Sequence, residues 1–333
     1  MWFSKTKHQE TQNTADILAS VLSDGITLSI NELINYQSKA SLINLAGNKN
    51  LSGKMAGNYL ARSKGRGMEF DEVRHYQVGD DIRAIDWRVT ARTGETHTKL
   101  FREEIERPVL IATDLSNSML FGSQLLFKSV QAAHIAALVA WHAKSRGDRI
   151  GGVVFNQSQH SELKPRSRQQ GVLHYLHALA EIHQDSFSHQ KENDIAANTL
   201  SLEQNCARLR QLAKPGSLVY LITDGHYLNQ EVTRQLAHIS RHCELVVCLV
   251  TDPLEHKLPD SQKRINVAIT DGENRQNLQL GDKKIASDYQ RLANLLNSEK
   301  EQLLTKAGAR ILNFSASETL EAQLKNGVAT WNR

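Results

Sequence analysis

The sequence predicts an α/β protein whose mostly parallel sheet is covered by helices on both faces. From residue 108 onward, short apolar segments alternate with longer segments in which apolar residues recur at helical spacing. The short segments are apolar throughout rather than at alternate positions, as in strands that are buried on both faces. Helices between successive strands supply the crossover connections that parallel strands need.

The order of the predicted elements follows this alternation. The expected strands span 108–114, 149–156, 217–225, 243–253 and 309–317. The expected helices span 123–147, 171–183, 199–213, 229–242, 285–308 and 318–328. Gly147 ends the first of these helices, and Pro215 and Gly216 end the third, because both residue types interrupt helices. Residues 273–284 are polar and predict a hairpin or loop.

The region before residue 108 predicts a less regular organisation. Residues 15–47 carry two helical patterns, and Ser29 and Glu32 open the second one with the spacing of a capping box. A segment rich in glycine and lysine follows at 48–67 and predicts an exposed loop. We therefore expect three parts, which are a flexible tail at 1–14, an N-terminal helical region with a charged segment at 15–107, and the sheet domain at 108–333.

Composition excludes several classes of protein. The chain has 333 residues with three scattered cysteines, which argues against a zinc site and predicts reduced thiols. Its longest apolar runs are far shorter than the roughly 20 residues that span a bilayer. Its first residues lack the apolar core of a signal peptide. We therefore expect a soluble, cytoplasmic protein.

The charge distribution argues against a nucleic-acid-binding protein. The net charge is +4, but the densest segment, 62–107, holds ten basic and ten acidic residues. A surface that follows a phosphate backbone gathers one sign of charge. The balanced segment predicts internal ion pairs instead, and a basic patch assembled by the fold stays the weaker alternative.

Oxygen-bearing side chains follow two of the predicted strands. Asp114 ends the first strand and is followed by Ser116 and Ser118, and Asp224 ends a later strand. In open parallel sheets, functional groups gather beyond the carboxyl ends of the strands. Alternate side chains of an extended loop point the same way, so three oxygens can converge on a hard cation such as Mg²⁺. The alternative is that these residues only form a turn and cap the next helix.

Other catalytic patterns do not match. The Gly53-Lys54 pair lacks the glycine spacing and the following hydroxyl of a Walker A phosphate-binding loop, so the strand that ends at Asp224 is unlike the Walker B strand of a nucleoside triphosphatase. The Gly-x-Ser-x-Gly motif of serine hydrolases is missing from the sequence. Ser116 stands where an aspartyl phosphatase would have a second acid.

The strand followed by Asp114, Ser116 and Ser118 resembles that of a von Willebrand factor A domain. That resemblance implies a Rossmann-like fold and a Mg²⁺ site, with Mn²⁺ or Ca²⁺ as alternative ions. It also implies two further ligands, a threonine from a later loop and an aspartate at the end of a central strand. Thr199 and Asp224 match these positions, and Thr199 is expected to open its helix. Asn198 stands where many members have glycine.

The segment upstream is similar to the bacterial DUF58 family. The run GDDIRAIDW at 79–87 and the following Ala-Arg pair lead to the Asp114 loop, as in that family. The resemblance implies a non-enzymatic adaptor that works with a MoxR-type AAA+ ATPase on a client protein. A partner carboxylate would complete the metal shell. A metal-dependent hydrolase is the alternative function, and a nucleic-acid-binding protein is a weaker one.

The charged segment itself predicts a structural role. Its paired charges would attach the segment to the sheet domain, because unpaired charge is costly to bury, and its tryptophan would be a packing anchor. A partner surface is the second interpretation. The residues concerned are Tyr76, Asp80, Asp81, Arg83, Asp86, Trp87 and Arg92.

Overall fold

The structure is a computed structural model that describes residues 14–43, 68–103, 106–188, 195–261, 265–270 and 275–326. The predicted tail and the predicted loop at 48–67 lie outside these residues, apart from residue 14. The chain forms two compact units. The sheet domain comprises residues 1–49 and 107–333, and the hairpin unit comprises residues 50–106. The predicted region 15–107 is therefore not one part, because its helices belong with the sheet.

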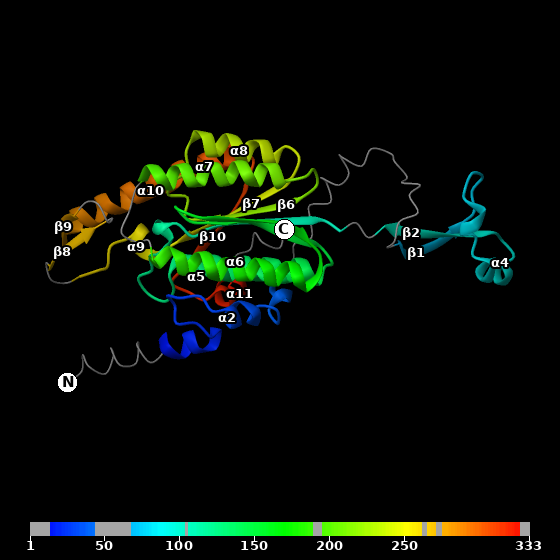
Figure 1. Cartoon of the computed structure of the whole chain (residues 1–333), viewed down its shortest axis with the longest axis horizontal. Coiled ribbons are helices and arrows are strands. Elements are labelled where there is room, and N and C mark those ends of the chain that lie inside the picture. The colour runs from blue at the N-terminus through cyan, green and yellow to red at the C-terminus, as the bar shows by residue number, and fades with distance from the viewer. Residues whose placement is uncertain are drawn as a thin grey trace. The chain divides into compact units, whose positions relative to one another are not determined.

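The sheet domain is built on six strands in the order β10-β7-β6-β3-β4-β5 (Figure 1). Neighbouring strands are parallel except β4 and β5, which are antiparallel. The strands are β3 (Pro108–Asp114), β4 (Arg149–Phe155), β5 (His160–Arg166), β6 (Leu218–Thr223), β7 (Glu244–Thr251) and β10 (Arg310–Ser315). The expected mostly parallel sheet is confirmed. The edge strand β5 was not expected because it is largely exposed and polar.

Helices cover both faces of this sheet, and Figure 1 shows the two layers. One face carries α2 (Ile30–Asn35), α5 (Lys128–Ser145), α6 (Arg168–Ser188) and α11 (Leu320–Lys325). The other carries α7 (Ile195–Leu212), α8 (Gln230–Ser240) and α10 (Lys283–Lys306). A separate apolar core lies on each side. The strand order and the two helical layers are those of a von Willebrand A-like fold.

Short elements connect these layers. They are the 3₁₀ turns η1 (Ala40–Leu42) and η3 (Asn117–Met119), the helix α9 (Pro253–His256), and the hairpin of β8 (Ile265–Thr270) and β9 (Arg275–Leu280). The polar segment expected as a hairpin or loop at 273–284 supplies the second strand of that hairpin and the start of α10.

Helix α5 is buried on every side rather than amphipathic as expected, because the N-terminal helix α2 covers its outer face. All of its residues from Lys128 to Ala143 are buried. The Trp141 indole donates a hydrogen bond to the Leu33 carbonyl oxygen at 3.0 Å, and the His134 imidazole pairs with buried Glu32. The predicted capping box of Ser29 and Glu32 is present at the start of α2.

The hairpin unit consists of β1 (Met68–His75) and β2 (His97–Glu103), paired antiparallel, with η2 (Ile82–Ala84) and α4 (Trp87–Thr93) between them. Its acidic residues are used inside the unit. Asp80 pairs with Arg74 at 2.7 Å, and Asp81 and Asp86 accept backbone N–H groups at the starts of η2 and α4. The Tyr76 hydroxyl donates to the Asp80 carbonyl oxygen at 3.4 Å.

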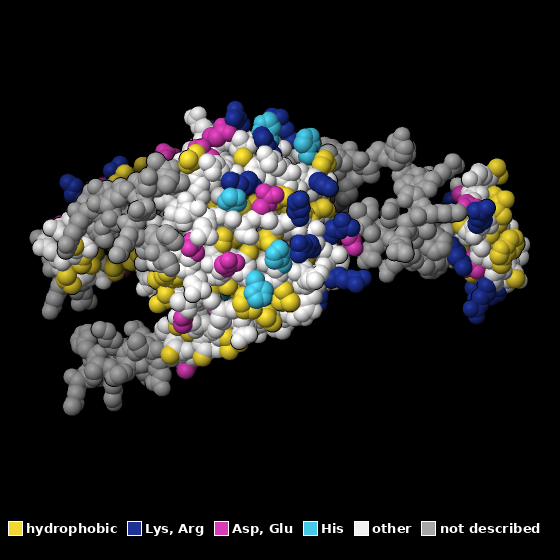
Figure 2. All heavy atoms as spheres, viewed as in Figure 1, with side chains coloured by type: hydrophobic (Ala, Val, Ile, Leu, Met, Phe, Trp, Pro, Cys, Tyr) yellow, Lys and Arg dark blue, Asp and Glu magenta, His cyan; other side chains and the backbone are white. Residues whose placement is uncertain are grey.

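Several basic and aromatic side chains of this unit are exposed to solvent, whereas several of its acidic side chains are bonded within it. Trp87, which was predicted to anchor this segment, is 66 % exposed and does not pack inside the hairpin unit. Arg83 and Arg92 are exposed and lie in the last turns of η2 and α4. Exposed apolar side chains gather in the same unit (Figure 2), and they include Val78 and Ile82.

Gly152 of β4 allows the two central strands to approach each other. Its φ is +145°, and a Cβ built on it would lie 1.9 Å from the Ile111 carbonyl oxygen of β3. Because β3 carries Asp114 at its end, this close approach also sets the position of the candidate site.

We predict that Gly152→Ala lowers the free energy of unfolding by more than about 3 kcal/mol, because backbone must move to admit the methyl group. Gly216→Ala is the matched control, since its φ is +84° but no atom lies within 4 Å of the added Cβ. The control should cost only about 1 to 2 kcal/mol. Urea unfolding followed by circular dichroism measures both, and equal losses would contradict the prediction.

Candidate cation site at the ends of β3 and β6

Asp114 is held in one orientation at the end of β3. Strands β3 and β6 are parallel neighbours, so their carboxyl ends meet at the same edge of the sheet. The Thr223 hydroxyl, at the end of β6, donates to Asp114 Oδ2 at 2.8 Å. The Ser116 backbone N–H donates to Asp114 Oδ1 at 3.0 Å. The carboxylate is therefore buried, aimed and hydrogen-bonded on both oxygens.

The two serine hydroxyls lie side by side after this strand. Ser116 Oγ and Ser118 Oγ are 3.4 Å apart. Ser116 precedes the 3₁₀ turn η3, but its hydroxyl makes no capping hydrogen bond to it. Helix α5 begins after Phe127 and also has no side-chain cap. The alternative that these serines serve only as helix caps therefore does not account for their hydroxyls.

Asp224 lies beside them and is paired with a buried lysine. Lys128 Nζ, at the start of α5, donates to Asp224 Oδ2 at 2.8 Å and also bonds to Glu255 of α9. The His226 N–H donates to Asp224 Oδ1 at 2.9 Å. The side chains of Lys128 and Asp224 are 2 % and 3 % exposed. This ion pair joins the beginning of α5 to the end of β6.

In the pair of Lys128 and Asp224, charge interactions together affect the pKa values more strongly than burial does. Burial would raise the pKa of Asp224, but the Lys128 ammonium holds that pKa well below its usual range. Burial would lower the pKa of Lys128, but the carboxylates of Asp224 and Glu255 raise it instead. Both groups therefore stay charged at neutral pH.

Asp114 differs from Asp224 because it has no cationic partner among the described residues. Burial and the negative charge of Asp224 together raise the pKa of Asp114 to about 6, against the lowering effect of the hydrogen bonds from Ser116 and Thr223. Of the two buried carboxylates, Asp224 is paired with Lys128, whereas Asp114 is paired with no described cation. The site is short of positive charge.

Thr199 is placed differently from the prediction. Helix α7 begins at Ile195, so Thr199 is its fifth residue and does not open the helix from a loop. The preceding alanines, Ala196 and Ala197, are strong helix formers and extend the helix toward its start. The structure thus brings Asp114, Ser116 and Ser118 together with Asp224 beside them. Thr199 is half-buried on the helix.

Three further residues complete the surroundings and were not predicted from the sequence. Lys128 and Thr223 bond to the two aspartates. The Tyr227 hydroxyl is bonded to Ser118, and burial together with the charges of Asp224 and Asp114 raises the pKa of Tyr227 to about 12. The lysine that begins this largely apolar helix was a sequence signal that could have indicated a buried ion pair.

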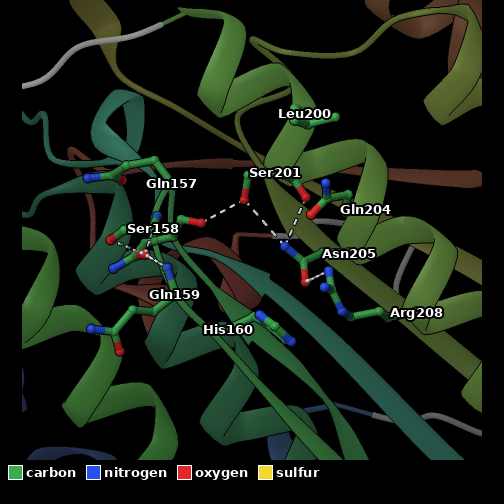
Figure 3. A pocket seen from close by; sticks show the side chains of 10 residues that line it. Gln157, Ser158, Gln159, His160, Leu200, Ser201, Gln204, Asn205 and Arg208 are labelled. Carbon is green, nitrogen blue, oxygen red and sulfur yellow. Dashed lines mark hydrogen bonds between the residues drawn. The ribbon is translucent and has the colours of Figure 1, made fainter.

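A polar pocket of about 160 Å³ lies next to the site, between α7 and the turn after β4 (Figure 3). The Ser201 hydroxyl of α7 donates to the Asn156 carbonyl oxygen at 2.6 Å. Gln157 of the same turn donates to the Asn117 side chain at 3.0 Å. Helix α7, this turn and the serine loop are therefore linked by hydrogen bonds.

The described residues contain no group of three or more histidine, cysteine, aspartate or glutamate side chains arranged to hold a metal ion. Any cation at the Asp114 site would therefore rely on hydroxyl oxygens as well. The cysteines are free and buried, as expected. Among the helices described, none is both long and apolar enough to cross a membrane.

Comparisons with known proteins point to one family. Residues 72–299 match the model of the family described as protein of unknown function DUF58. Uncharacterized proteins of Mycobacterium bovis and Mycobacterium tuberculosis are 25 % identical to this chain over 285 residues, which cover 85 % of this chain and 86 % of theirs.

Solved structures are more distant. The conserved hypothetical protein BatB from Bacteroides thetaiotaomicron is 14 % identical, with a TM-score of 0.40 over 67 % of this chain and 96 % of its own. A von Willebrand factor type A structure from Catenulispora acidiphila is 17 % identical, with a TM-score of 0.31 over 46 % of this chain and 35 % of its own. The fold assignment above rests on the strand order and helical layers.

We predict that Lys128→Met lowers the free energy of unfolding by about 3 to 5 kcal/mol, because it leaves Asp224 buried without its cation. Lys257→Met is the control, since Lys257 also pairs with an acid, Asp260, but is 55 % exposed. That control should cost less than about 1 kcal/mol. Chemical denaturation at pH 7.5 measures both variants. Similar small losses would mean that the buried pair does not stabilise the site.

Proposed function

The chain belongs to the DUF58 family of proteins of unknown function, and on that premise we propose that it is a cation-dependent protein-binding adaptor rather than an enzyme. The observation that carries this proposal is the charge imbalance at the end of β3. Asp114 is a buried carboxylate without a cationic partner among the described residues, and two serine hydroxyls lie beside it. A hard cation bound here would supply the missing charge.

The donor set fits a small divalent ion. Mg²⁺ prefers oxygen ligands and keeps several waters, and Mn²⁺ and Ca²⁺ accept the same donors. Asp114, Ser116 and Ser118 would hold the ion. Asp224 already bonds to Lys128 and to the His226 N–H, so it would act on the bound waters rather than bind the ion directly. A ligand role for Thr199 stays a prediction.

An incomplete protein shell favours binding over catalysis. One directly bound carboxylate and two hydroxyls would leave coordination positions that a carboxylate of another protein could fill. A hydrolase would need a general base whose pKa lies near neutral. Lys128 and Tyr227 are unsuited to that role, because the pKa of Lys128 is raised and that of Tyr227 lies at about 12. The pKa of Asp114 is raised to about 6, but in this proposal its carboxylate is occupied as a ligand of the ion. We therefore place the hydrolase second.

A MoxR-type AAA+ ATPase is the partner that we propose, with an unidentified client protein, following the resemblance of the 79–87 segment. An ATP-driven partner implies that both proteins lie in the cytoplasm. The hairpin unit supports an adaptor because its exposed Trp87, Ile82 and Val78 offer apolar contact area. Arg74 and Lys99 of this unit pair with its acidic residues, which disfavours nucleic-acid binding by these two basic side chains.

We predict that Asp114→Asn raises the melting temperature in EDTA but abolishes the further rise caused by Mg²⁺. Folding raises the pKa of this carboxyl from 3.8 to about 6, so stability falls as pH rises through that window and the charged form is disfavoured at pH 7.5. Asparagine mimics the neutral form, and the gain should be about 1 to 3 kcal/mol.

Asp148→Asn is the matched control for this experiment. Asp148 is also buried, with a raised pKa, but it lies before β4 and accepts the Arg107 N–H at 3.0 Å. This variant should keep the full response to Mg²⁺ in differential scanning fluorimetry. A Mg²⁺ response that survives Asp114→Asn would place any cation elsewhere.

We also predict that a purified MoxR-type AAA+ ATPase binds the wild-type chain in Mg²⁺ but not the Asp114→Asn variant. Surface-bound chain and soluble ATPase allow surface plasmon resonance at constant Mg²⁺, so the nucleotide of the ATPase is undisturbed. Asp148→Asn again serves as the control that should bind normally. Equal binding of all three proteins would refute the cation-dependent contact while leaving the partnership intact.

A further inference from the structure

We propose that Asn198, rather than Thr199, supplies the oxygen that helix α7 contributes to the cation site, an inference that rests on the proposed function. Asn198 is 1 % exposed, and neither its amide nitrogen nor its amide oxygen makes a hydrogen bond within the described part of the chain. A buried amide that loses its hydrogen bonds to water is costly, and native proteins keep few such groups. This amide is therefore expected to have a partner that the described part of the chain does not supply.

The level of Asn198 along the sheet follows from helix α7. This helix ends at Leu212, shortly before β6 begins at Leu218, so its amino end lies toward the carboxyl ends of the parallel strands. The Ser201 hydroxyl bonds to the Asn156 carbonyl oxygen at 2.6 Å (Figure 3). Asn156 directly follows Phe155, the register partner of Asp114. The part of helix α7 around Ser201 therefore lies at the same height along the sheet as Asp114.

Asn198 lies one helical turn beyond that level, toward the loop that carries Ser116 and Ser118. A turn of α-helix rises about 5.4 Å, which matches the step from the end of a strand to the loop that follows it. The helix therefore brings residue 198 over the edge of the sheet where the serine hydroxyls lie.

The direction of the Asn198 side chain follows from its neighbours on the helix. Leu202 and Cys206 follow it by four and eight residues, so all three share one face of α7. Both are buried in the core that includes Leu110 and Ala112 of β3. Side chains alternate along a strand, so Asp114 points to the same side of the sheet as these two residues.

The charge of Asp114 is felt on this same helix face. Burial raises the pKa of the Cys206 thiol, and the Asp114 carboxylate raises it further. Thr199 is displaced by about 100° around the helix from Asn198 and is only half-buried. Thr199 also borders the face of Leu202 and Cys206, but the Asn198 amide is fully buried there without a hydrogen bond to the described residues, which favours Asn198 as the oxygen donor.

An amide suits this role chemically. Its carbonyl oxygen is a ligand that hard cations accept, and it adds no charge to a site that already holds Asp114 and Asp224. Its NH₂ group remains free to donate to a bound water or to a partner carboxylate. A buried water that fills the same space is the competing occupant, and the experiment below separates the two.

The test measures Mn²⁺ binding by electron paramagnetic resonance and Mg²⁺ binding by calorimetry, on the full chain and three variants. Asn198→Ala should weaken both ions about tenfold or more, while Asn198→Asp should bind them at least as tightly as wild type. Thr199→Ala is the matched control on the same helix and should stay within about twofold of wild type.

The melting temperature in EDTA provides a second readout. Asn198→Ala should melt no lower than wild type, because it removes an unsatisfied amide, so weakened ion binding would not reflect misfolding. Wild-type affinity in Asn198→Ala, or a loss confined to Thr199→Ala, would overturn the assignment and indicate a trapped water at Asn198. A wild-type chain that binds neither ion would overturn the proposed function itself and this assignment with it.

Discussion

The ion pair between Lys128 and Asp224 determines how the rest of the site is arranged. It lies between the beginning of α5 and the end of β6, and Glu255 of α9 joins it from a third element. Because both partners are almost fully buried, neither can be satisfied by water, and the three elements must meet at this point. In this pair, the positive charge of Lys128 neutralises the negative charge of Asp224. Asp114 is left without a cationic partner among the described residues.

The central position of α5 links this site to the N-terminal region. Residue 128 begins a helix that is buried almost throughout, and α2 covers its outer side through the Glu32 and Leu33 contacts. The start of α5, which holds Lys128 in place, therefore depends on residues far earlier in the chain. The hairpin unit is a separate unit in which Asp80 and Asp86 form internal ion pairs, while the apolar side chains of Val78, Ile82 and Trp87 are exposed.

Much of the fold could be predicted because its signals are local. Fully apolar strands and the amphipathic helices between them identify a parallel sheet, and the capping box of Ser29 and Glu32 was found where expected. The edge strand β5 and the hairpin unit were missed because their strands are rich in polar residues. Each of these strands also pairs with only one neighbouring strand, so it lacks the continuous apolar sequence of a central strand. The burial of α5 was also missed, since its covering helix is distant in the sequence.

By itself, the sequence determined the spacing of Asp114, Ser116 and Ser118 and the strand that carries them, because alternation along an extended chain is a local property. It also determined that Asp224 ends another strand of the same sheet. Only the tertiary structure decided that Lys128 neutralises Asp224, that Thr223 orients Asp114, and that α7 begins before Thr199 with the amide of Asn198 buried. These features depend on which distant side chains share a buried space, and burial and charge pairing are set by packing rather than by neighbouring residues.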